Sequence, residues 1–441
     1  MCPQARYNPK RMKYRNLFVG LLCLPGLFAQ ISPVQELIEA VRADSPKLAE
    51  LLARKDSFGY RVPEMTGRDG VAVWGQEFLF AVESAADATV VIDNDAPAPM
   101  KRVPGTGYWY LLKTLRLGTT HQYHYFAGGR EIGGYQVAGY NPDSYPEPGV
   151  PRGKLSERRT LVSKVYPGMS SNYWVYVNPG ADLVNGAPLM VWQDGETIVG
   201  NQDWMRLRLQ IVSDNLVAQK KIPPMVHVLI QPGTGGQEVS APGGAMRSIE
   251  YDTVSDRYGK YLLEEVLADV EKTYKIRKDA YSRAIAGASS GAICAMNVAW
   301  YYPGEFSRVL SHIGSYTAIQ WHPEKNQDGG YIVALRVRRD PKKNLRVWMS
   351  DGSDDQEAGS GSWPLNNIQL ANSLKLRGYD FHFRFGVSLH SIAQGALDLP
   401  ESLTWLWRDY DAAKTQQTYQ MEESERARPM FRVSITNREA W

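Results

Sequence analysis

The chain has 441 residues, of which 43% are hydrophobic and 22% are charged, and its formal net charge is only +3. This composition is typical of a globular protein, and the length exceeds that of one typical domain, so we expect two domains. The clusters of Arg and Lys are short and scattered. They exclude the concentrated basic face that a nucleic-acid-binding protein needs, so no nucleic-acid partner is expected.

The N-terminus is predicted to be a signal peptide that spans residues 1–29. Basic residues precede an apolar run from Leu17 to Phe28, and Ala29 is a small residue suited to cleavage. The apolar run is too short to span a membrane. Because signal peptides rarely carry a long polar preface, Met12 is an alternative start, and a buried N-terminal helix is the alternative structure. We therefore expect a secreted or periplasmic protein without a membrane anchor.

The cysteines are few, namely Cys2, Cys23 and Cys294. Removal of the predicted signal peptide leaves one of them. An intramolecular disulfide cannot then form, so the fold must be held by its core.

The next part of the chain changes from helical to strand-like patterning. Residues 30–56 are predicted to be a helical segment, because charges and leucines interleave at helical spacing between residues 33 and 54. Residues 57–140 contain short runs rich in β-branched and aromatic residues, separated by Gly-rich turns, and they predict a small immunoglobulin-like β-sandwich. The predicted strands are Val71–Trp74, Phe78–Val82, Thr89–Asp93, Tyr108–Tyr110 and His121–Phe126.

Residues 141–154 are predicted to be a Pro-rich linker, after which strands alternate with helices over residues 155–412. This alternation predicts a largely parallel sheet covered by helices, which is an α/β fold. Residues 413–441 are predicted to be a polar, irregular surface tail. The predicted strands are Thr160–Val165, Asn172–Val177, Leu189–Gln193, Met225–Gln231, Ala284–Ala286, Arg308–His312, Leu345–Met349 and Phe381–Phe385, and the predicted helices are Tyr258–Tyr274 and Ala292–Trp300.

One motif carries most of the chemistry, Gly287-Ala288-Ser289-Ser290-Gly291. It lies between a short strand-like run and a helical stretch, as a nucleophile elbow does. The turn is so tight that flanking glycines are needed, and it lifts the serine hydroxyl above the edge of the sheet. The Gly-x-Ser-x-Gly pattern occurs nowhere else in the sequence. It predicts Ser289 as the nucleophile of an α/β-hydrolase domain that follows the sandwich.

His390 is the predicted base for this nucleophile. In α/β-hydrolases the chain order is serine, acid, histidine, and the histidine lies in a loop after a strand. His390 follows the predicted strand Phe381–Phe385 in such a loop, whereas the other histidines precede the acid or lie within strands. The histidines set aside on these grounds are His121, His124, His227, His312, His322 and His382.

The acid is expected at the end of the strand Leu345–Met349, where three aspartates follow one another closely. A turn at Gly352 would place Asp355 just past the strand end and direct it toward the histidine loop. Asp355 is therefore the preferred acid, and Asp354 and Asp351 are the alternatives. Aspartates in such positions are also common turn formers.

An oxyanion hole needs two backbone N–H groups. The predicted donors are Ser290, which follows the nucleophile, and Glu196, in the loop after Leu189–Gln193; an ordinary tight turn is the alternative for that loop. Arg247 and Glu250 are candidate substrate-binding residues, and a structural Arg–Glu pair is the alternative. Three tryptophans in loop-like segments are candidates for stacking on a substrate ring: Trp204, Trp321 and Trp363.

Together, these residues resemble the putative esterase family, which includes enterochelin, feruloyl and acetylxylan esterases and mycolyltransferases. The resemblance covers about residues 155–412. It implies the triad Ser289–Asp355–His390 and an oxyanion donor at Glu196, and the sandwich resembles the domain that precedes the catalytic part of enterochelin esterases. The distinctive runs are Arg247–Asp252, Ser255–Tyr258, Leu262–Glu265, Arg283–Gly291, Leu310–Ser315, Ser350–Asp355 and Leu399–Arg408.

The sequence departs from the family at two places that bear on the substrate. The family often has His-Asn-Gly-Lys-His-Gly-Gly after the catalytic histidine, where this chain has His390-Ser-Ile-Ala-Gln-Gly-Ala396. A glycine is also common where this chain has Ala292. Neither departure touches the predicted triad.

The predicted function is that of a serine carboxylesterase that acts through an acyl-enzyme and needs no metal or other cofactor. Export favours feruloyl or acetyl esters of plant polysaccharide as substrates. The alternatives are hydrolysis of a siderophore trilactone, acyl transfer to a sugar or alcohol, and a non-catalytic carbohydrate-binding protein on the same fold. The sequence leaves the oligomeric state open.

Overall fold

The computed structural model describes residues 32–54, 70–199, 207–239 and 244–433. The predicted signal peptide and Trp204 lie outside these residues. The chain divides into two units, Met1–Ser32 and Pro33–Trp441, and the second unit is the one described below. Within the described residues, no helix has the length and apolar character that crossing a membrane requires.

The predicted helical segment is two helices rather than one. α1 (Pro33–Arg42) ends before Asp44, which has a positive φ of 47°, and α2 (Leu48–Ala53) begins shortly after Pro46. Proline disfavours a helical conformation of the residue before it, which explains the break. The apolar sides of both helices are buried with side chains of the sandwich such as Leu79.

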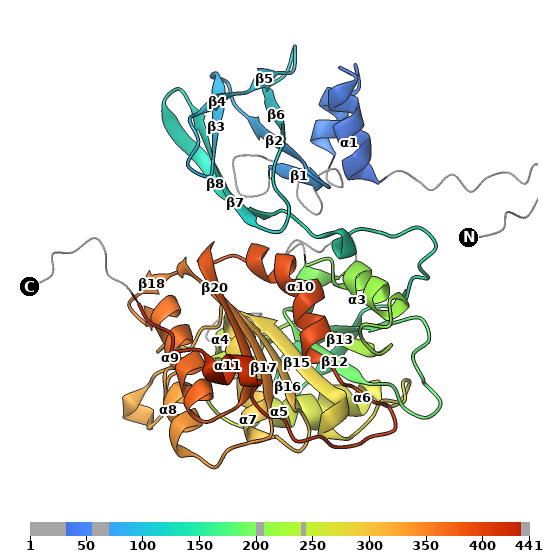
Figure 1. The fold of residues 1–441 in the computed structure, drawn as a ribbon, viewed down its shortest axis with the longest axis vertical. Coiled ribbons are helices and arrows are strands. Elements are labelled where there is room, and N and C mark those ends of the chain that lie inside the picture. Colours follow the sequence, from blue (N-terminus) through green and yellow to red (C-terminus); the bar gives the residue numbers. More distant parts are fainter. Residues whose placement is uncertain (1–31, 55–69, 200–206, 240–243, 434–441) are drawn as a thin grey trace, which may run out of the picture. The chain divides into compact units, whose positions relative to one another are not determined.

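The predicted antiparallel sandwich is confirmed as two four-stranded sheets (Figure 1). One sheet has the order β1-β2-β6-β5 and the other β4-β3-β7-β8. Three strands were not predicted, because two are only two residues long and β8 contains the pair Gly133-Gly134. The strands are β1 (Val71–Trp74), β2 (Glu77–Glu83), β3 (Ala88–Ile92), β4 (Ala98–Pro99), β5 (Lys101–Arg102), β6 (Tyr108–Thr114), β7 (Thr120–Ala127) and β8 (Arg130–Ala138).

The segment predicted as a linker is packed against the following helix α3 (Leu209–Ala218). It contains a short 3-10 helix, Pro142–Ser144. Asn215 Nδ2 donates to the backbone carbonyls of Asp143 (2.8 Å) and Tyr145 (2.7 Å). These contacts fix the path of the chain between the sandwich and the larger sheet.

The larger sheet, which is separate from the two sheets of the sandwich, has the predicted α/β-hydrolase arrangement. Its main order is β10-β11-β13-β12-β15-β16-β17-β20, and β9 (Lys154–Leu155) and β14 (Thr234–Gly235) pair with β11. The first pairings are antiparallel, whereas the six strands from β13 to β20 in this order are parallel. The main strands are β10 (Arg159–Val162), β11 (Met169–Val177), β12 (Leu189–Gln193), β13 (Val226–Ile230), β15 (Arg283–Ala288), β16 (Arg308–His312), β17 (Arg346–Asp354) and β20 (Asp380–Leu389).

Helices cover both faces of this sheet, so alternate residues of its central strands enter two different cores. Val191 and Ile285 lie in the same core as residues of α7 (Ser290–Tyr301) and α9 (Trp363–Leu376). Trp192 and Ala284 lie in the other core, with residues of α3 and α10 (Ala393–Leu406). Burial on both faces explains why these strands appear in the sequence as nearly continuous apolar runs. The remaining helical stretches are α4 (Arg247–Tyr251), α5 (Arg257–Tyr261), the π-helical Leu262–Leu267, α6 (Ala268–Val270) and α8 (Ile332–Arg339).

The segment predicted as an irregular surface tail is partly built into the domain. Tyr419 and Met421 are buried, and α11 (Glu423–Ala427) follows them. The ring of Tyr419 contacts the guanidinium groups of Arg308 and Arg346, which are buried at the amino ends of β16 and β17. The sequence prediction was therefore wrong for this part, because two aromatic or apolar side chains in a polar stretch are enough to anchor it.

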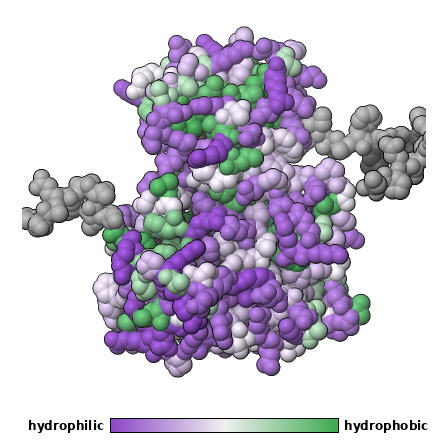
Figure 2. Space-filling view, in the orientation of Figure 1, coloured by the Kyte–Doolittle hydropathy of each residue, from purple (hydrophilic) through white to green (hydrophobic). Residues whose placement is uncertain are grey.

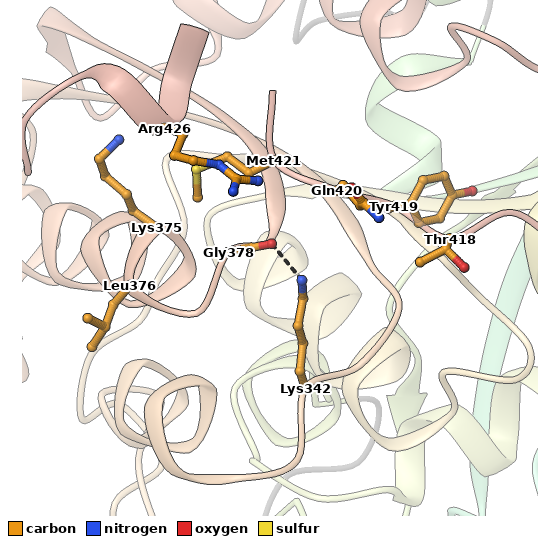
Figure 3. Close-up of a pocket in the computed structure, with 9 residues that line it drawn as sticks. All are labelled: Lys342, Lys375, Leu376, Gly378, Thr418, Tyr419, Gln420, Met421 and Arg426. Carbon is orange, nitrogen blue, oxygen red and sulfur yellow. Dashed lines mark hydrogen bonds between the residues drawn. The ribbon is translucent and has the colours of Figure 1, made fainter. Parts of the chain in front are cut away.

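A surface hollow of about 470 Å³ lies beside this segment (Figure 3). Lys342, Lys375 and Arg426 line it, and Lys342 Nζ donates to the carbonyl oxygen of Gly378 (2.6 Å). Lys342 and Gly378 precede β17 and β20 in the chain. The hollow therefore lies at the amino ends of the strands, at the edge of the sheet opposite Ser289.

The face of the protein in Figure 2 is largely hydrophilic, with apolar side chains gathered in small patches. This distribution is expected when most aliphatic side chains are enclosed in the cores described above.

A buried ion-pair network ties the amino ends of β17 and β20 together. Asp380, which is 1% exposed, accepts hydrogen bonds from Arg346 Nε (2.7 Å) and from an Arg408 nitrogen (2.6 Å). We predict that Asp380→Ala lowers the free energy of unfolding by about 3–5 kcal/mol, because the buried guanidinium group of Arg346 and the partly buried one of Arg408 lose their carboxylate. Urea denaturation followed by circular dichroism measures the change.

The matched control is Asp328→Ala in the same domain, where the carboxylate pairs with Arg336 at the surface. This change should cost less than about 1 kcal/mol. Equal losses in the two variants would contradict the role given to Asp380.

Candidate active site

The segment around Ser289 has the geometry of a nucleophile elbow. β15 ends at Ala288 and α7 begins at Ser290, so one residue makes the whole turn. Ser289 has φ 56° and ψ −122°, a conformation that is strained for a side chain other than glycine. A Cβ atom on Gly287 would lie 2.3 Å from the Gly291 carbonyl group, and one on Gly291 would lie 2.9 Å from Gln193 Cβ. Only glycine fits at either position, which explains the motif.

The structure brings Ser289, His390 and Asp355 into one hydrogen-bonded chain. Ser289 Oγ lies 3.0 Å from His390 Nε2, and His390 Nδ1 lies 2.5 Å from Asp355 Oδ1. The Asp355 side chain is fully buried, whereas that of His390 is 20% exposed. Asp355 Oδ1 also accepts from the backbone N–H of Gln356 (2.6 Å). Among the three candidate acids it is Asp355, and not Asp354 or Asp351, that hydrogen-bonds to His390. The Asp354 side chain instead accepts from Gln122 Nε2 (3.4 Å).

Strand register explains why the acid and the histidine meet. In the parallel pair of β17 and β20, Asp354 lies opposite Leu389 after a register shift at Gly352. Asp355 and His390 are the first residues after the two strands, so they lie next to each other at the same edge of the sheet.

Trp363 supports the His390 ring rather than offering a surface for a substrate. It is 4% exposed, and its ring meets the His390 ring edge-on at a centroid distance of 5.7 Å. The stacking role expected for Trp363 is therefore wrong, because the side chain is already packed as the first residue of α9. Trp321, by contrast, is 50% exposed.

Ser315 is a site residue that the sequence reasoning missed. Its Oγ lies 3.1 Å from Ser289 Oγ and accepts a hydrogen bond from Trp363 Nε1 (3.1 Å). Because an indole N–H can only donate, the Ser315 hydroxyl group keeps its own proton available for donation to Ser289 Oγ. When Ser315 donates in this way, the Ser289 proton is available to His390 Nε2. Ser315 is the last residue of Leu310–Ser315, one of the runs that carry the family resemblance, and that run was the only sequence signal that pointed to it.

The two predicted oxyanion donors occupy tight turns at the carboxyl edge of the sheet. Ser290 is the first residue of α7, where the helix dipole favours negative charge. Glu196 lies in the 3-10 helix Gly195–Ile198, which follows Asp194, a residue with a positive φ of 57°. The role of their N–H groups as oxyanion donors stays a prediction.

The structure pairs Arg247 with Asp194, and the substrate-binding role of Arg247 stays a prediction. Arg247 holds Asp194 with two hydrogen bonds, from Nε to Oδ1 (2.7 Å) and from a terminal nitrogen to Oδ2 (2.8 Å). The structural partner of Arg247 is thus Asp194 and not Glu250, and the pair fixes the turn that carries Glu196. Glu250 is 1% exposed, so it does not line an open pocket. It accepts from the Gly233 N–H (2.7 Å), and burial raises its pKa to about 8.

A polar hollow of about 510 Å³ lies among the segments that follow β13 and β16. Gln320, which lines it, donates to Ser248 Oγ (3.0 Å). The buried Asp252 interacts in turn with the hydroxyl groups of Ser290 and Ser248, and burial raises its pKa to about 6. A chain of polar contacts from Gln320 through Ser248 and Asp252 therefore links the hollow to Ser290, the residue after Ser289. Other polar residues that line it are Glu238, Arg257, His322 and Lys325.

The described residues contain no group of three His, Cys, Asp or Glu side chains placed to hold a metal ion. Two of the histidines set aside, His227 and His312, are buried in β13 and β16. Burial lowers the pKa of His227 to about 3 and that of His312 to about 4, so both are neutral core residues.

Asp351 forms a buried carboxyl pair with Asp355. Asp351 Oδ1 accepts from the Gly352 N–H (2.9 Å), while Oδ2 of each aspartate is buried without an N–H or O–H partner among the described residues. Burial and the adjacent Asp355 carboxyl group raise the pKa of Asp351 far above its usual range. A protonated Asp351 that donates to Asp355 satisfies both groups and holds the acid in place.

Comparisons with known proteins show which family and fold the chain resembles. The model of a family described as "Putative esterase" matches residues 168–399. The uncharacterized protein YbbA of Bacillus subtilis (strain 168) is 23% identical over 235 residues, which is 52% of this chain and 84% of that protein.

Solved structures share the fold at low identity. The enterobactin esterase FES from Shigella flexneri is 18% identical with a TM-score of 0.54, over 75% of this chain and 93% of that one. The ferric enterobactin esterase from Salmonella typhimurium is 18% identical with a TM-score of 0.51, over 78% of this chain and 95% of that one.

Asp351→Asn should flatten the pH dependence of stability. Native Asp351 keeps a proton that the unfolded chain releases above about pH 4. The folded state therefore binds more protons at neutral pH, so the free energy of unfolding falls as pH rises toward the raised pKa of Asp351. Asparagine keeps a donor for Asp355 but does not titrate. Urea denaturation between about pH 5 and pH 9 should show a smaller decline for the variant than for the wild type.

Asp354→Asn is the control, because Asp354 is exposed and adjacent in the chain. Its stability should follow the wild-type curve. Parallel curves for the wild type and Asp351→Asn would contradict the shared proton.

Proposed function

The chain belongs to the putative esterase family and is a carboxylic-ester hydrolase; from this premise we propose that Ser289 is its nucleophile, His390 its general base and Asp355 the acid that orients His390. One observation carries the proposal, namely the continuous hydrogen-bond chain from Ser289 Oγ through both nitrogens of His390 to Asp355. It begins at a strained elbow at the carboxyl edge of a parallel sheet, where catalytic groups of this fold lie.

In the first step, His390 Nε2 takes the Ser289 proton while Ser289 Oγ attacks the carbonyl carbon of the ester. The buried Asp355 holds His390 Nδ1–H and stabilises the imidazolium that forms. The hydrogen bond between His390 Nδ1 and the buried Asp355 Oδ1 supports this role. Ser315 contributes by directing the Ser289 proton at His390, as its hydrogen bonds with Trp363 and Ser289 suggest.

The negative charge that develops on the carbonyl oxygen is placed near the N–H groups of Glu196 and Ser290. Such preorganised donors lower the barrier most where charge develops. The intermediate then collapses, and His390 gives its proton to the departing alcohol. Water attacks the acyl-enzyme with His390 as base, and the acid is released from Ser289. No metal or other cofactor is required for these steps.

The substrate class we favour is a feruloyl or acetyl ester of plant polysaccharide. The predicted signal peptide would bring the enzyme to a secreted or periplasmic location, where such polymers are accessible. The polar hollow lined by Gln320, which is linked to Ser290 through Ser248 and Asp252, offers amide, hydroxyl and charged groups that suit a hydroxyl-rich substrate.

A siderophore trilactone is the second candidate. The observation in its favour is that the likeness to the Shigella flexneri enterobactin esterase covers 75% of this chain, more than the hydrolase part alone. The two candidates differ in the acid and the alcohol that the enzyme must hold, so direct comparison of substrates distinguishes them.

We predict that Ser289→Ala lowers ester hydrolysis by roughly 10⁵–10⁶-fold and leaves the fold intact. The measurement compares p-nitrophenyl acetate, methyl ferulate and ferric enterobactin on protein that lacks the predicted signal peptide. Turnover of one natural ester over the others, abolished in the variant, identifies the substrate class. A folded Ser289→Ala protein with full activity would refute the mechanism. Wild type that neither hydrolyses any ester nor reacts with a serine-directed phosphonate would indicate a non-catalytic binding protein.

We further predict that Asp355→Asn lowers kcat by about 10⁴-fold, because the histidine loses the carboxylate that fixes its tautomer and stabilises its charge. Asp354→Asn is the matched control and should stay within about twofold, since its carboxyl group is exposed. If the control loses activity and Asp355→Asn does not, Asp354 is the acid.

A further inference from the structure

The loop that carries His390 is held by a side chain from the sandwich. Tyr135, on β8, donates a hydrogen bond from its hydroxyl group to the backbone carbonyl oxygen of His390 (2.5 Å). The bond joins residues 255 positions apart in the chain. The backbone of the predicted base is thereby fixed directly from the other half of the protein.

The next residue of β8 holds both flanks of His390. Gln136 Oε1 accepts hydrogen bonds from Ser388 Oγ (3.0 Å) and from Ser391 Oγ (2.9 Å). Gln136 Nε2 donates to Thr120 Oγ1 on the neighbouring strand β7 (3.2 Å), which anchors the other end of the amide in the sandwich. Gln136, Ser388 and Ser391 are all at most 6% exposed. Displacement of the sandwich would break both of these hydrogen bonds to the loop.

A third residue of the sandwich reaches the ends of the two strands that carry the acid and the base. Gln122, on β7, donates to the carbonyl oxygen of Val387 (3.3 Å) and contacts Asp354 Oδ2 (3.4 Å). Figure 1 shows the end of β20 extending toward β7 and β8. Because β8 is an edge strand of its sheet, side chains of consecutive residues can both reach a segment that runs beside it.

We propose that the sandwich is a positioning domain for the catalytic base, with Tyr135 and Gln136 as the positioning residues. This proposal rests on the proposed function of His390. The loop spans residues 390–392, between the end of β20 at Leu389 and the start of α10 at Ala393. Proton transfer from Ser289 to His390 depends on their alignment, and a displacement of 1 Å lowers the rate by about 10²-fold. Tyr135 and Gln136 hold the short loop between β20 and α10 in place.

The test uses Tyr135→Phe, Gln136→Met and the double variant in the otherwise complete protein. We expect kcat to fall by about 10- to 100-fold in the double variant and KM to stay within about threefold, because alignment and not substrate contact is lost. The short His390–Asp355 hydrogen bond should give a low-field proton resonance from Nδ1–H, and this resonance should shift or broaden in the variants. A purely structural role for the two residues would lower stability without moving the resonance of the folded protein.

Tyr108→Phe is the matched control, because Tyr108 lies on β6 in the other sheet and packs against the cluster of the N-terminal helices. It should leave kcat and the resonance unchanged. Unchanged kcat and resonance in the Tyr135→Phe, Gln136→Met double variant would overturn the proposal. A wild-type protein without Ser289-dependent hydrolysis would instead overturn the proposed function, and the resonance would still report whether the sandwich positions His390.

Discussion

Parallel pairing of β15, β16, β17 and β20 is the constraint on which the rest of the structure depends. It aligns Ala288 with His312, and His312 with Ser350, across neighbouring strands. The residues that leave these strands therefore emerge at one edge. Three side chains that are as much as 101 positions apart in sequence then need only short loops to meet. A register error in any one pairing would separate them and turn core side chains to the wrong face.

Buried polar groups at the two ends of these strands play different parts. At the amino ends, two arginines share the carboxylate of Asp380, and a ring of aromatic side chains surrounds Arg308. At the carboxyl ends, Arg247 fixes the turn at Asp194, and Asp351 faces Asp355. The groups at the amino ends hold neighbouring strands together, whereas those at the carboxyl ends fix the positions of single site residues. This difference fits an edge where chemistry requires positions to be held within fractions of an ångström.

Much of the fold and the core of the site could be predicted, because their signals are local. Runs of β-branched residues identified the sheet, and the motif around Ser289 requires glycines for steric reasons that depend only on neighbours. Pairings between distant side chains left no such signal. A pair of Arg247 with Glu250, three residues away, was the structural alternative, whereas the actual contact of Arg247 with Asp194 joins residues 53 positions apart. For the same reason Ser315, Trp363 and Tyr135 were not recognised as supports of the site.

The strained turn at Ser289 has a consequence for how this protein can vary. Glycine adopts a positive φ more readily than any other residue, so a glycine at this position would relax the backbone. Substitutions that favour stability and those that preserve the hydroxyl group therefore oppose each other at one residue. Selection for heat resistance alone would favour variants that lose the nucleophile. Selection for turnover would keep Ser289 in its strained conformation, which the surrounding strand and helix must hold in place.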